Sequence, residues 1–179
     1  RCGFHRCLGR RGIPHLPNNE IVRIQPKHGL KSRREGQSLT RVYLDLRQAI
    51  CRHYYDAYGV SVEPEQVVVT SGTSPAMMLA FAALLEEGSE VILSDPGYAC
   101  YPNFIRFFGG EPSWVAVYEE DGFALQPEAV AGRLDDRTAA VVINSPSNPT
   151  GGLLSASAMQ AIAALAEEHR SARIISDEI

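Results

Sequence analysis

Short apolar runs alternate along most of this chain with segments in which apolar residues recur at helical spacing. The runs are rich in Val and Ile and are bounded by Gly, Pro, Asn or Asp, which is typical of buried β-strands. They predict strands at 66–70, 90–94, 113–118, 138–143 and 173–176. The periodic segments predict helices at 44–58, 75–86, 101–108, 127–134 and 155–169.

This alternation of strands and helices determines the expected architecture. Helices that separate consecutive strands allow those strands to run parallel. The strands are almost continuously apolar, as they are when helices cover both faces of a sheet. We therefore expect an α/β fold with a mostly parallel sheet flanked by helices over residues 42–179. Residues 1–41 lack periodicity and are expected to form an irregular N-terminal arm.

The composition of the 179 residues is ordinary for a soluble globular domain, with 45% hydrophobic and 21% charged residues. No apolar stretch reaches the ~20 residues that span a bilayer, so no membrane segment is expected. The net charge of −4 is uneven, because residues 1–41 hold ten of the 17 basic side chains. A basic arm could bind nucleic acid, but this one has no recognised binding motif, and a solvated arm is the favoured interpretation.

The cysteines argue against a metal site. Cys2 and Cys7 are close in sequence, but no second pair follows at zinc-finger spacing. Cys51 and Cys100 lie apart within other patterns. We therefore expect no metal, and free cysteines of this kind suit the reducing cytoplasm.

Four polar segments each follow a predicted strand, at 70–75, 95–103, 144–151 and 176–178. The third reads NSPSNPTG, and its two prolines and glycine exclude a strand interior. Because the carboxyl ends of parallel strands meet at one edge of a sheet, polar loops there are where open α/β folds bind ligands. The four segments together predict a ligand site.

The first of these segments leads into a helix. Its Gly72, Thr73 and Ser74 could present free backbone N–H groups to an anion at the helix N-terminus. The alternative is an ordinary Ser/Thr cap of the helix. No Gly-Lys-Ser/Thr follows, so the segment is not a P-loop.

The other three segments carry side chains suited to a planar, polar ligand. Tyr98 or Tyr101 could offer a ring to such a ligand, or both could pack at a loop edge. Asn148 provides a donor and an acceptor. Asp177 is either a buried carboxylate that needs a cationic partner, or a helix cap or surface acid.

In this order and spacing, the four segments resemble those of the class I/II aminotransferases, which use pyridoxal 5′-phosphate on the aspartate aminotransferase fold. The NSPSNPTG segment followed by Ser-Asp-Glu at 176–178 is the most specific part, and the resemblance covers residues 42–179. It implies a partial cofactor-binding large domain there. It also implies six cofactor-binding residues: Gly72, Thr73 and Ser74 for the phosphate, Tyr101 for stacking on the ring, Asn148 for the phenolic oxygen and Asp177 for the ring nitrogen.

The lysine that this family attaches to its cofactor as a Schiff base has no counterpart here. The two lysines of the chain are Lys27 and Lys31, whereas the family places its lysine beyond the aspartate. We therefore predict no catalytic residue within the chain. The chain is expected to be a fragment of the large domain that cannot transaminate by itself.

The resemblance implies transfer of an amino group between an amino acid and a 2-oxo acid, in a homodimer when the protein is full length. Carbon–sulfur lyases and aminocyclopropane-carboxylate synthases share these cofactor contacts and remain alternatives. The aminotransferase-like domain of a transcription regulator is a further alternative, although the arm lacks a helix-turn-helix pattern. A generic nucleotide-binding domain is disfavoured, because the chain has no glycine-rich fingerprint.

Overall fold

A computed structural model describes residues 39–169 and 172–178 of the chain. Residues 1–38, which are most of the predicted arm, therefore lie outside the described residues. The described residues up to Ala76 form one compact unit, and those from Met77 onward form another. Each unit is considered by itself. None of the helices in the described ranges is long and apolar enough to cross a membrane.

The first unit contains a long helix and a short 3₁₀ turn, α2 (Leu39–Tyr58) and η1 (Pro64–Gln66). α2 confirms the predicted helix but begins at Leu39 rather than at residue 44. Gly59 follows it with a φ of +69°, the left-handed conformation that ends helices. The Arg47 side chain donates to the carbonyl of Pro64 and so links α2 to η1.

The strand predicted at 66–70 is wrong. Gln66 belongs to η1, and residues 67–70 adopt no regular structure, although Val67 has extended dihedral angles (φ −105°, ψ 119°). A strand requires a neighbour that pairs with its backbone N–H and C=O groups. The sheet of the described residues does not include this segment, and Val68 remains 54% exposed. The apolar pattern is thus typical of a strand, but no other described segment pairs with these residues.

The second unit is built on a four-stranded sheet. Its strands are β1 (Glu90–Asp95), β2 (Glu111–Ala116), β3 (Thr138–Asn144) and β4 (Arg173–Asp177). The helices are α3 (Thr73–Leu84), α4 (Tyr101–Phe107), η2 (Glu119–Asp121), α5 (Pro127–Ala131) and α6 (Ala156–Glu168). The boundary between the two units falls within α3.

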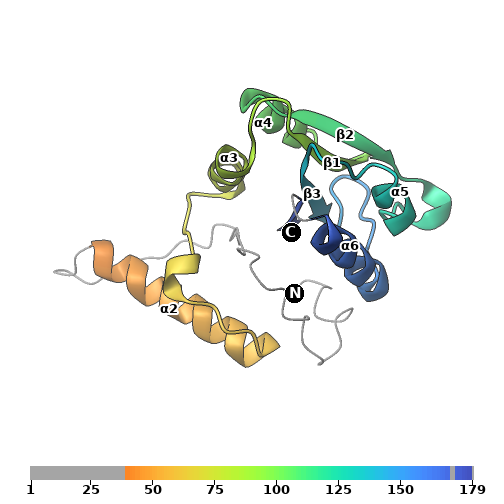
Figure 1. The fold of residues 1–179 in the computed structure, drawn as a ribbon. Helices are drawn as coiled ribbons and strands as arrows, with labels where there is room; N and C mark the ends of the chain where they lie inside the picture. The colour runs from red at the N-terminus through yellow and green to blue at the C-terminus, as the bar shows by residue number, and fades with distance from the viewer. Residues whose placement is uncertain (1–38, 170–171, 179) are drawn as a thin grey trace. The chain divides into compact units, whose positions relative to one another are not determined.

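All strand pairs of the sheet are parallel, in the order β2-β1-β3-β4. The prediction of a mostly parallel sheet is therefore confirmed. Crossovers between parallel strands are almost always right-handed. Because β1 connects toward one edge of the sheet and β2 and β3 connect toward the opposite edge, this rule puts α4 on one face and α5 and α6 on the other. α5 and α6 accordingly contact each other, and α4 contacts β2 (Figure 1).

The order of the strands creates a topological switch point between β1 and β3. The chain leaves β1 toward one edge of the sheet and leaves β3 toward the other. Open α/β sheets bind ligands at such a point, outside the carboxyl ends of the strands. The carboxyl ends of β1 and β3 are followed by two of the polar segments identified in the sequence, 95–103 and 144–151.

The core of this unit is formed by the central strands and the helices against them. Ile92 of β1 and Val141 of β3 are fully buried, with Val130 of α5 and Ile162 of α6 in the same cluster. Complete burial of such a side chain contributes roughly 1.5–3 kcal/mol. This packing holds the ends of the strands, and thus the polar segments that follow them, on a rigid base.

Some predicted boundaries differ from the observed ones. β2 begins at Glu111 rather than at residue 113, and α5 ends at Ala131 rather than at residue 134. Gly132 ends α5 early, since glycine is a poor helix former. The helix predicted from Ser155 is confirmed, with Ser155 as its N-cap.

We expect Ser155→Ala to lower the free energy of unfolding by about 1 kcal/mol. The Ser155 Oγ accepts a hydrogen bond from the Ala158 N–H at 3.1 Å, and alanine would leave that N–H without a partner. Urea unfolding measures the loss. Ser155→Asp, which retains an acceptor, is the control; an equal loss in both variants would contradict the capping role.

Candidate functional site

Asp177 is a buried carboxylate at the carboxyl end of β4. It lies opposite Asn144 in the register of β3 and β4 and is 7% exposed. The Tyr101 hydroxyl donates a hydrogen bond to its Oδ2. A carboxylate removed from water needs such donors or a cationic partner, so Asp177 is the acidic centre of this edge of the sheet rather than a surface acid.

Tyr101 is the first residue of α4 and is only 4% exposed. Burial, followed by the hydrogen bond to Asp177, raises the pKa of Tyr101. Both effects disfavour the phenolate, because the anion would lack solvent and would face another negative charge. Tyr101 therefore acts as a neutral donor to Asp177.

Tyr98 lies beside Tyr101 in the turn before α4. The two ring centroids are 5.1 Å apart at an interplanar angle of 74°, an edge-to-face contact. A hydrogen bond with Cys100 is the main cause that raises the pKa of Tyr98. Unlike Tyr101, Tyr98 is only partly buried, so its ring is the more accessible of the two.

Gly97 allows this turn to approach the end of β1. A Cβ at Gly97 would lie 2.4 Å from the Ser94 carbonyl oxygen, which no side chain tolerates. Position 97 requires glycine because a side chain has no room there. The backbone conformation does not require it, because the φ of Gly97 is not in the left-handed region. The close approach fixes the start of the segment that carries Tyr98 and Tyr101.

Asn144 connects Asp177 to the loop that contains Asn148. Its Nδ2 donates to the Asp177 carbonyl at 3.1 Å, and its Oδ1 accepts from the Asn148 N–H at 2.7 Å. We did not identify Asn144 as a site residue from the sequence. The available signal was its place as the last residue of a strand before a polar loop, together with an amide that donates and accepts.

The loop after β3 is tied to itself by backbone hydrogen bonds. Ser147 N–H donates to the Gly152 carbonyl at 2.8 Å, and Gly151 N–H donates to the Ser147 carbonyl at 2.7 Å. The peptide bonds before Pro146 and Pro149 are both cis. Asn148 is exposed at the tip of this loop, where its amide side chain is available to a ligand.

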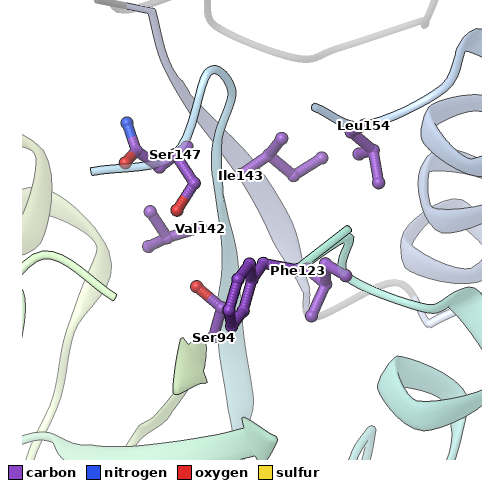
Figure 2. A pocket seen from close by; sticks show the side chains of 8 residues that line it. Ser94, Phe123, Val142, Ile143, Ser147 and Leu154 are labelled. Atoms are coloured by element: carbon purple, nitrogen blue, oxygen red, sulfur yellow. The ribbon is translucent and has the colours of Figure 1, made fainter. Parts of the chain in front are cut away.

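A small cavity of about 20 Å³ lies at the switch point, between the ends of β1 and β3. Figure 2 shows Ser94, Phe123 and Ser147 around it. Asn144 also lines it. The cavity thus joins the end of β1, the end of β3 and the loop of Asn148.

The predicted anion-binding segment belongs to the first compact unit. Gly72 has a φ of +135°, a conformation that favours glycine, and α3 begins at Thr73. The Thr70 hydroxyl donates to the Gly72 carbonyl at 2.8 Å. Thr73 and Ser74 therefore occupy the first turn of a helix, where backbone N–H groups have no helical acceptor.

The structure thus brings three of the six predicted residues into one network of the second unit. Asp177 and Tyr101 are in direct contact, and Asn144 links Asp177 to Asn148. Gly72, Thr73 and Ser74 are described only within the other unit. Their contribution to the same site stays a prediction.

Comparisons with known proteins identify the family and the fold of this chain. The family profile described as aminotransferase class I and II matches residues 13–179. An aspartate/prephenate aminotransferase of Thermus thermophilus is 40% identical over 168 residues, which are 94% of this chain and 43% of that protein. A probable aspartate/prephenate aminotransferase of Aquifex aeolicus is 42% identical over 75% of this chain and 34% of its own length.

Solved structures show the same fold. An aspartate aminotransferase from Thermus thermophilus with maleate matches with a TM-score of 0.72 and 40% identity, over 75% of this chain and 35% of that chain. An alanine aminotransferase from Pyrococcus furiosus matches with a TM-score of 0.71 and 32% identity, over 74% and 34%. The chain therefore spans less than half the length of these relatives.

The parallel α/β sheet, the acidic centre at its carboxyl edge and the profile match lead to one assignment. The fold class predicted from the sequence is confirmed by these structural neighbours. The chain belongs to the class I and II aminotransferase family.

Proposed function

We propose that this chain is part of an aminotransferase that moves an amino group between an amino acid and a 2-oxo acid with pyridoxal 5′-phosphate. The observation that carries the proposal is the buried Asp177 carboxylate, held by the Tyr101 hydroxyl at the carboxyl edge of the sheet, in a chain of this family. When bound, pyridoxal 5′-phosphate supplies an electron-withdrawing ring for reactions at the α-carbon of amino acids.

The residues present fit a cofactor with a cationic ring nitrogen and an aromatic face. Asp177 would hold the ring nitrogen, because a buried carboxylate stabilises a proton on a nearby base. Tyr101 keeps Asp177 oriented through its hydroxyl. We predicted Tyr101 as the stacking residue, but the residue is only 4% exposed, so the partly buried Tyr98 is the alternative that accessibility favours.

Asn148 and the start of α3 would hold the oxygens of the cofactor. The exposed amide of Asn148 would donate to the phenolic oxygen, and the Asn144 bond to its backbone limits how the loop moves. Gly72, Thr73 and Ser74 would bind the phosphate through the N–H groups and hydroxyls at the N-terminus of α3. Both contributions follow from the chemistry of the donors.

The substrates, partner and location are part of the same proposal. Relatives named aspartate/prephenate aminotransferase and a neighbour with maleate support an acidic amino acid such as aspartate as the donor. Prephenate, a 2-oxo acid, is the matching acceptor to test. We further propose a homodimer when full length, and a cytoplasmic location.

Equilibrium binding of pyridoxal 5′-phosphate to the 179-residue chain tests the proposal. We expect saturable binding that dialysis reverses, because no lysine follows residue 31. We expect no turnover with aspartate and prephenate for the same reason. Binding is followed by the visible absorbance of the cofactor.

The variant that combines Lys27→Arg and Lys31→Arg is the matched control, since it removes both lysines and keeps their charge. Equal, reversible binding by the parent chain and this variant supports a non-covalent site. Loss of binding in the variant, or no saturable binding by the parent chain, would overturn the cofactor assignment. Turnover by the variant would overturn the argument from the missing lysine.

A further inference from the structure

A tight turn at Gly122 and Phe123 has an unusual backbone. Gly122 has a φ of +63° and Phe123 a φ of +55°. Phe123 is the non-glycine residue with a positive φ among the residues that the structure describes. The turn is closed by hydrogen bonds from Phe123 N–H to the Tyr118 carbonyl (2.8 Å) and from Ala124 N–H to the Asp121 carbonyl (3.2 Å). A side chain in the left-handed region is unfavourable and persists only where its surroundings hold it.

The surroundings that hold this turn are the loop after β3. A Cβ at Gly152 would lie 2.8 Å from the Gly122 carbonyl oxygen and 2.9 Å from the Phe123 carbonyl oxygen. Gly152 itself has no left-handed φ. The glycine is therefore required by the close approach of the two backbones, and the turn and the loop are in direct contact.

Gly152 is connected to Asn148 through the backbone bonds of that loop. The Gly152 carbonyl accepts from Ser147 N–H, and Asn148 N–H donates to the side chain of Asn144. Phe123 lines the same cavity as Asn144 and Ser147 (Figure 2). The turn therefore contacts the segment that presents Asn148 at Gly152, and the Phe123 side chain lines the cavity that Asn144 and Ser147 also line.

We propose that the Gly122–Phe123 turn is a positioning element that fixes the Asn148 loop by backbone contact with Gly152. Phe123 and Gly152 act through Asn148 and need not touch a ligand. The ligand that Asn148 would bind rests on the proposed function. The claim that the turn fixes the Asn148 loop does not rest on it, because it concerns the chain without cofactor.

Amide hydrogen exchange, followed by NMR on the full chain without cofactor, tests this proposal. In Gly152→Ala we expect the amides of Ser147, Asn148 and Gly151 to exchange at least about tenfold faster, because the added Cβ separates the loop from the turn. Amides within β3 and β4 should keep their rates. Gly132→Ala is the matched control, since Gly132 has an ordinary φ and a Cβ there would meet atoms no closer than 3.6 Å.

Two substitutions of Phe123 separate positioning from apolar packing. Phe123→Gly retains the left-handed turn and removes the ring, whereas Phe123→Val keeps an apolar side chain that resists a positive φ. We expect Phe123→Val to loosen the Asn148 loop as Gly152→Ala does, and Phe123→Gly to leave the exchange of Asn148 within about twofold of the parent chain. If Gly152→Ala fails to fold, these two Phe123 variants still test whether the turn positions the Asn148 loop.

The opposite order, with Phe123→Gly loosening the loop more than Phe123→Val, would show that the ring only fills space and would overturn the proposal. Unchanged exchange in Gly152→Ala, or equally faster exchange throughout the sheet, would overturn it as well. Failure of the chain to bind pyridoxal 5′-phosphate would count against the proposed function only, because exchange is measured without it.

Discussion

Asp177→Asn is expected to weaken the binding of pyridoxal 5′-phosphate by roughly 10- to 100-fold. The substitution keeps the shape of the side chain and an oxygen that accepts from Tyr101, but it removes the negative charge at the carboxyl edge of the sheet. A hydrogen bond to a charged group contributes about 1.5–3 kcal/mol, and each 1.4 kcal/mol is about tenfold in affinity. The expected loss therefore reports the charge that we propose to lie opposite the ring nitrogen.

The measurement is a titration of each protein with the cofactor, followed by its visible absorbance. Asp136→Asn is the matched control, because Asp136 is an exposed acid just before β3, at the amino end of the sheet. It changes the net charge equally and is expected to leave the affinity within about twofold. Equal affinities in the parent chain and Asp177→Asn would refute the assignment of Asp177 to the ring nitrogen.

The regular part of the fold was predictable from the sequence because burial leaves a pattern in it. β1, β3 and β4 follow the apolar runs closely, and Ser155 marks the start of α6. These features depend on local preference and on hydrophobic periodicity. A helix also lies between each pair of consecutive strands of the sheet, which is enough to predict parallel pairing.

Pairing between distant segments leaves no such pattern. Residues 67–70 have the composition of a strand, yet no described segment pairs with them. The composition of a segment can favour a β-strand, but whether another strand lies beside it to pair with depends on the rest of the fold. This is why the strand predicted there was wrong while the others were confirmed.

Contacts within the candidate site were also only partly predictable. Asp177 was identified from its place at a strand end, but its bond to Tyr101 joins residues 76 positions apart. Asn144 was missed because its role depends on the register that sets it opposite Asp177. The need for glycine at position 152 comes from the approach of a turn that the sequence gives no reason to place there.

Tyr101→Phe is expected to lower the stability of the chain most at neutral pH, and less as the pH rises above about 10. At neutral pH the variant leaves the buried Asp177 carboxylate without the Tyr101 hydroxyl, which costs about 1–3 kcal/mol. Burial and Asp177 raise the pKa of Tyr101 above its ordinary value of 10.0. The folded chain therefore holds the phenol proton more tightly than the unfolded chain does.

The sign of the pH dependence follows from that difference. The stabilisation by the protonated Tyr101 is fully present below pH 10 and is lost as the pH rises from there toward the folded pKa, by up to about 1.4 kcal/mol per pH unit. Phenylalanine has no proton to lose, so this part of the alkaline destabilisation is absent in Tyr101→Phe. Urea unfolding between pH 8 and pH 11 should show the stabilities of the two proteins converging.

Tyr118→Phe, at a tyrosine that is 56% exposed, is the control. The difference in stability between this variant and the parent chain should stay constant over the same pH range. A gap between the parent chain and Tyr101→Phe that stays constant up to pH 11 would mean that the Tyr101 hydroxyl is not the buried donor that holds Asp177.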